Sequence, residues 1–72
     1  MDYRYIRAWA KMMGYYPPQL AFQLEKARSD NPPADAIFFR GGRWYTFSQI
    51  TRADTRAIME KTLATLPPLE SV

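Results

Sequence analysis

The feature that most constrains this chain is a pair of glycines between two short runs that favour β-strands. Gly41 and Gly42 separate residues 36–40 from residues 43–47, and both runs are rich in aromatic or β-branched side chains. Glycine adopts the positive φ angles that a two-residue turn requires, so the pattern predicts a β-hairpin over residues 36–47. Because an isolated two-stranded hairpin is only marginally stable, we expect it to pack against a helix.

A basic amphipathic helix is predicted over residues 3–13, ahead of the hairpin. Asp2 is a suitable N-cap, and Gly14 is a suitable residue to end the helix. The apolar residues that recur at helical spacing are Ile6, Trp9, Ala10 and Met13. The basic residues on the opposite face are Arg4, Arg7 and Lys11.

Prolines and a serine delimit two further helices. Pro17 biases the preceding residue away from helical angles, and Pro18 suits the first turn of a helix predicted over residues 18–28. Ser48 is a suitable N-cap for a third helix, predicted over residues 49–66 and stopped by the two prolines after it. The sequence therefore predicts one small α+β domain over residues 1–72, ordered helix, helix, β-hairpin, helix.

The third helix is apolar on two nearly opposite faces. One face consists of Ile50, Ala53, Ala57 and Ala64, and the other consists of Met59, Leu63 and Leu66. A helix that is apolar on two faces is normally buried on both. The first helix can cover the second face from inside the domain, or another chain can cover it. We expect a partner protein or a second copy to cover part of it, with Met59, Leu63 and Leu66 as the contact row.

The alternation of the hairpin leads to an expected core. Its predicted members are Trp9, Met13, Leu24, Ile37, Phe39, Trp44, Ile50 and Ala57. Since successive side chains of a strand point to opposite faces, we expect Phe38 and Tyr45 to be more exposed than their neighbours.

The second half of the chain resembles the N-terminal edge of the adenylate-forming enzymes, the superfamily of acyl-CoA synthetases. The resemblance covers roughly residues 20–66. The residues that match the family pattern are Pro32, Ala36-Ile37, Phe39, Gly41-Gly42, Trp44, Thr46-Phe47 and Gln49-Ile50. The helix departs from that pattern at Asp54-Thr55-Arg56, where the family has Asn and small residues. In that family this segment is structural, and the phosphate loop and catalytic lysine come later, so the resemblance implies a separated or degenerate piece of an acyl-activating enzyme.

No catalytic constellation is found among the residues. The chain has no His and no Cys, which removes the commonest general base and the thiolate metal ligands. Two glycines between strands do not supply the helix N-terminus that a phosphate loop needs. We therefore expect no enzymatic activity, no cofactor and no metal. The absence of Cys fits a reducing compartment, so a cytoplasmic location is expected.

The basic residues are candidates for a binding surface. Those predicted to form it are Arg4, Arg7, Lys11, Arg40 and Arg43. A net charge of +3 permits contact with nucleic acid or with an anionic membrane surface, although a solvated helix face explains the same pattern. The function expected first is therefore a non-catalytic accessory module that binds another protein chain. The alternative is a small nucleic-acid-binding or regulatory protein.

Overall fold

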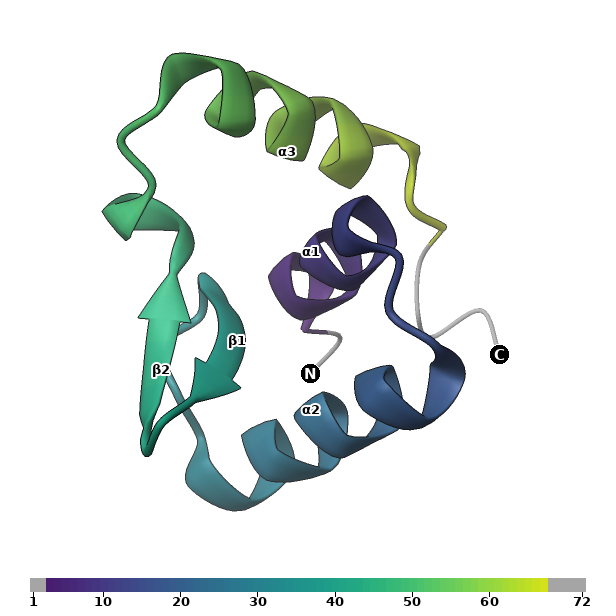
Figure 1. Ribbon diagram of the computed structural model, residues 1–72, viewed down its shortest axis with the longest axis vertical. Coiled ribbons are helices and arrows are strands. Elements are labelled where there is room, and N and C mark those ends of the chain that lie inside the picture. The colour runs from purple at the N-terminus through teal and green to yellow at the C-terminus, as the bar shows by residue number, and fades with distance from the viewer. Residues whose placement is uncertain (1–2, 68–72) are drawn as a thin grey trace.

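The computed structural model describes residues 3–67 and shows a small α+β domain (Figure 1). Its helices are α1 (Arg4–Met13), α2 (Pro17–Asp30) and α3 (Ala53–Thr65). Its strands are β1 (Ala36–Arg40) and β2 (Arg43–Thr46), and a 3-10 turn at Phe47–Gln49 follows β2. The predicted order of helix, helix, hairpin and helix is confirmed. Asp2, the expected N-cap of the first helix, lies outside the described residues.

Helix α1 lies in the middle of the molecule, with α2, the hairpin and α3 arranged around it (Figure 1). Its fully buried residues are Ile6, Ala8 and Ala10, and the two small alanines allow its neighbours to approach closely. The apolar stripe predicted from the sequence corresponds to one buried face of the helix, whereas α2, the hairpin and α3 all pack against α1. Met13 was predicted in the core, but it lies in the last turn and is 50% exposed.

The hairpin has the predicted turn but the opposite arrangement of faces. Gly41 and Gly42 both have positive φ angles, 59° and 81°, as a two-residue turn requires. The register shifts between Ala36 and Phe38, which is a β-bulge. The bulge allows Ile37 and Phe38, although adjacent in sequence, both to contact the core.

Phe38 and Tyr45 therefore pack against the core, which corrects the expectation that they are the exposed pair. Phe39 and Trp44, both predicted in the core, occupy the other face of the hairpin, where their ring centroids lie 5.4 Å apart. A one-residue change of register moves every side chain of a strand to the opposite face, and the bulge has that effect here.

Helix α2 is joined to the hairpin through the side-chain amide of Gln23, which is buried in the described structure. Its Nε2 donates a hydrogen bond to the carbonyl oxygen of Phe39 at 3.2 Å, and its Oε1 accepts one from the Phe39 amide at 2.7 Å. Burial of a polar side chain is tolerated because both ends of the amide have partners. These two bonds fix α2 beside β1.

The predicted third helix is divided. The chain first forms the 3-10 turn, in which the amide of Thr46 donates to Oε1 of Gln49 at 2.8 Å. It then takes extended angles at Ile50 before α3 begins. Ser48 lies inside this turn and is therefore not the N-cap of a long helix. Its amide donates a hydrogen bond to a carboxylate oxygen of Asp35 at 3.0 Å. The extended residue lets Ile50 pack against the core, as predicted for that side chain.

The two faces of α3 are also reversed relative to the prediction. Met59 is fully buried and Leu63 is 9% exposed, and both belong to the central core cluster with Ala8 and Ile37. The alanine face is exposed instead, including Ala57, which was predicted in the core. Burying large side chains removes more apolar area from water than burying alanines, so the helix turns its larger residues inward. The expected contact row is therefore internal, and its third member, Leu66, packs against the same cluster.

Candidate functional site

The predicted basic surface is divided by the structure into two groups. Arg4 donates a hydrogen bond to the carbonyl oxygen of Leu63 at 3.0 Å, and Arg7 donates one to that of Pro67 at 2.7 Å. Carbonyl oxygens near the C-terminal end of a helix are good acceptors for basic side chains. That of Leu63 also accepts the Leu66 amide at 3.4 Å, and Pro67 lies just beyond α3. These two arginines of α1 therefore bind carbonyl oxygens at and just beyond the C-terminal end of α3, while Arg4 stays exposed and Arg7 partly exposed.

The second basic group lies at the tip of the hairpin. Arg40 and Arg43 are exposed and directly opposite each other across the glycine turn. The guanidinium of Arg43 lies 5.6 Å from the centre of the Tyr45 ring. Within residues 3–67, neither arginine has a hydrogen-bond or carboxylate partner. Lys11, the remaining member of the predicted surface, is also exposed.

An apolar surface is formed where α1 turns into α2, and we call residues 13–22 the elbow (Figure 1). Three large apolar side chains of the elbow are exposed: Met13 at 50%, Tyr16 at 75% and Phe22 at 57%. An open pocket of about 390 Å³ lies on this segment and extends to the next residue of α2. The residues that line it are Tyr15, Pro18, Gln19, Phe22 and Gln23.

Local sequence explains why the elbow has a fixed shape. Gly14 takes a φ of 71° and ends α1, and the amide of Tyr15 donates to the carbonyl oxygen of Ala10 at 2.9 Å. Pro17 then begins α2, and the amide of Tyr16 donates to Oε1 of Gln19 at 2.8 Å. With both helix ends capped, the aromatic side chains of the turn are held at the surface.

Sequence reasoning missed the elbow as a site. Met13 was placed in the core, and Phe22 was not singled out. A signal was nevertheless present, because Phe22 lies between Leu20 and Leu24 and therefore off the stripe that they form with Ala27. An aromatic residue on the polar side of a helix is the kind of exposed apolar group that marks a binding surface.

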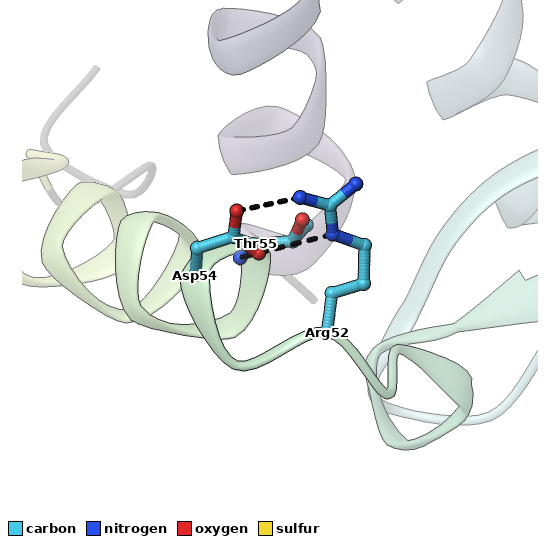
Figure 2. Close-up of polar contacts among 3 residues, drawn as sticks. All are labelled: Arg52, Asp54 and Thr55. Carbon is cyan, nitrogen blue, oxygen red and sulfur yellow. Dashed lines mark hydrogen bonds and ion pairs between the residues drawn. The ribbon is translucent and has the colours of Figure 1, made fainter.

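The first turn of α3 carries a compact polar contact that does not form a site (Figure 2). Arg52 pairs with the carboxylate of Asp54 at 2.8 Å, and the same carboxylate accepts the amide of Thr55 at 2.8 Å. The hydrogen bonds from Arg52 and then from the Thr55 amide hold the pKa of Asp54 below its usual value. A carboxylate in the first turn of a helix interacts favourably with the helix dipole.

The described residues contain neither a metal-binding cluster nor a membrane-spanning helix. No group of three His, Cys, Asp or Glu side chains among residues 3–67 is placed to hold a metal ion. In the same part of the chain, no helix is both long enough and apolar enough to cross a membrane.

Comparison with protein-family models, with curated proteins and with solved structures found no match to this chain. The relationship to the adenylate-forming enzymes, expected from the residues of the second half, therefore stays a prediction.

Proposed function

We propose that this chain is a non-catalytic interaction module that binds another protein through the elbow. The observation that carries the proposal is that, among residues 3–67, three of the four large exposed apolar side chains lie on one ten-residue segment, and one of them, Phe22, lines the open pocket. Several exposed apolar groups on one segment that also carries a concavity are typical of protein-binding surfaces, whereas single exposed residues are ordinary. The fourth such residue, Ile58 on α3, stands apart from the pocket.

The chemistry of the elbow defines the kind of partner. The pocket combines aromatic and proline surfaces with the side chain of Gln19, whose Oε1 is already bonded to the Tyr16 amide. Such a lining suits an apolar or aromatic anchor of a partner segment, with a rim of aromatic contacts around it. An accessory role beside an acyl-activating enzyme in the cytoplasm is part of this proposal, supported by the residues that resemble that family and by the lack of Cys.

The test uses Phe22→Asp and the matched control Ile58→Asp, because the two side chains are exposed to similar extents, 57% and 54%, and both lie on helices. Peptides are selected from a random display library on the wild-type protein, and their affinities for both variants are measured by fluorescence anisotropy. We expect peptides with one apolar anchor to bind Phe22→Asp at least about tenfold more weakly, since loss of a central contact costs on the order of 1.4 kcal/mol or more. They should bind Ile58→Asp as they bind the wild type. Peptides that bind Phe22→Asp with unchanged affinity would show that the elbow is not the docking surface.

A second experiment tests the non-catalytic character. The purified chain, incubated with ATP, magnesium and a panel of carboxylic acids, should show no ATP–pyrophosphate exchange above a blank without protein. Exchange that survives repurification of the chain would contradict the proposal.

A further inference from the structure

The hairpin tip places two like charges against each other. Arg40 and Arg43 form the last cross-strand pair before the turn, so their side chains leave the same face of the hairpin. Like charges directly opposite on a strand pair destabilise it. The turn has only the two glycines, which keeps the arginines close together.

Among the described residues, each of the other arginines donates a hydrogen bond within the protein, unlike the two at the hairpin tip. The five that donate hydrogen bonds within the protein are Arg4, Arg7, Arg28, Arg52 and Arg56. In the described part of the chain, the arginines of the tip have no acceptor that offsets their repulsion. An anion bound between them would supply that acceptor, and guanidinium groups bind phosphate oxygens with two parallel hydrogen bonds.

Aromatic rings surround the paired arginines on both faces of the hairpin. Below Arg43, the ring of Tyr45 stacks on Phe38 at 4.8 Å, and Phe38 stacks on Trp9 at 5.7 Å. On the other face, the partly exposed ring of Trp44 lies one residue from the tip. Tyr45, Phe38 and Trp9 pack against the core, so Trp44 is the ring on which a base can stack. Surfaces that bind single-stranded nucleic acid combine such a ring with basic side chains that contact the phosphates.

The turn itself is open to a ligand. A Cβ atom built at Gly41 or Gly42 would meet no other atom within 4 Å, so no side chain covers the backbone at the tip. The tip is therefore accessible to a phosphate from the outside of the turn as well as from the arginine face.

We infer that the hairpin tip binds the phosphate backbone of single-stranded nucleic acid through Arg40 and Arg43. An acidic protein segment would neutralise the same charges, but it would make no use of the partly exposed ring of Trp44 beside the tip. The net charge of +3 also favours a polyanion. Binding at the tip does not depend on the elbow, which uses other residues at the other end of α2 (Figure 1).

The experiment measures binding of fluorescent single-stranded RNA and DNA of about 12 nucleotides, a length within the site sizes of small single-strand-binding folds. The variants are Arg40→Gln, Arg43→Gln and, as the matched control, Lys61→Gln, which removes one exposed charge from α3. We expect each arginine variant to weaken binding about fivefold at low salt. Each should also reduce the slope of log affinity against log salt by about 0.7, the value for one phosphate contact on a single strand. Lys61→Gln should leave that slope unchanged.

Three results would overturn the inference. An equal loss in Lys61→Gln would show that diffuse charge rather than the tip attracts the strand. No binding to either oligonucleotide at low salt would exclude the ligand class. Tight binding to poly-glutamate in place of the oligonucleotides would assign the tip to an acidic protein segment. Phe22→Asp should bind the oligonucleotides as the wild type does, so failure of the elbow proposal is separable from failure at the tip. Circular dichroism of each variant establishes that the fold is retained.

Discussion

The seam between α1 and α3 and the tip of the hairpin use arginine in opposite ways. At the seam, Arg4 and Arg7 reach carbonyl oxygens at the end of α3, above the buried side chain of Leu63. At the tip, Arg40 and Arg43 have no such acceptors in the described structure. The residue type is the same, and the presence of a carbonyl acceptor within reach decides whether an arginine binds within the fold or remains free for a ligand.

The largest expected loss of stability comes from a substitution in the buried contact between α1 and α3. Leu63→Asp places a carboxylate in the core and should unfold the domain, because a cost of about 3–5 kcal/mol matches the whole stability of a chain this size. The control is Ala64→Asp, the exposed neighbour on α3, which should cost only about 1 kcal/mol, because Asp is a poorer helix former than Ala and is unfavourable near a helix C-terminus. Urea unfolding followed by circular dichroism measures both. If Leu63→Asp stays folded while light scattering shows a loss of self-association, the contact row expected from the sequence stands after all.

An intermediate loss of stability is expected on replacing Arg56, which joins α3 to the segment between β2 and α3. Arg56 donates to the carbonyl oxygens of Phe47 and Ile50 at 3.1 and 2.9 Å, and its guanidinium lies 4.2 Å from the Phe47 ring. Arg56→Met should lower the free energy of unfolding by about 2 kcal/mol, since charged hydrogen bonds in partly buried positions are lost. Arg52→Met removes an arginine from an exposed pair and should cost less than about 1 kcal/mol. Equal losses in the two variants would mean that the carbonyl contacts of Arg56 do not matter.

The smallest expected change in the free energy of unfolding is a stabilisation. Arg40→Thr removes one of two like charges at the tip and should raise the free energy of unfolding by about 0.2–1 kcal/mol. Lys61→Thr makes the same change of net charge on α3 and should not stabilise the protein. Thermal unfolding at low ionic strength is the appropriate measurement, because added salt screens the repulsion. A destabilised Arg40→Thr variant would mean that the tip arginines support the hairpin.

The elements could be predicted from the sequence because they depend on local signals. Gly14, the prolines before α2 and the two glycines of the turn each act on their own backbone, and the structure has the corresponding helix end, helix start and turn. The faces could not be predicted in the same way. The bulge near Ile37 and the 3-10 turn after β2 depend on contacts with distant residues, and each of them changes which side of the next segment faces the core.

The binding surfaces show the same limit. The sequence singled out the arginines of the tip because two of them flank the turn, which is a local fact. It placed Arg4 and Arg7 in the same surface, because nothing in residues 3–13 indicates that the carbonyl oxygens of Leu63 and Pro67 lie within reach. The elbow was missed for a related reason, since Met13 fits an apolar stripe whose end no neighbouring element covers.

The side-chain amide of Gln23 has a consequence for the solubility of the folded protein. β1 contains Ile37, Phe38 and Phe39 in succession, a sequence that favours intermolecular β-pairing and fibril formation. A strand at the edge of a sheet offers its unpaired N–H and C=O groups as a template for further strands. Gln23 occupies both groups of Phe39 and so gives this strand the partner that another molecule would otherwise supply. One glutamine in a helix thus blocks further strand pairing at Phe39, on the β1 edge of the sheet.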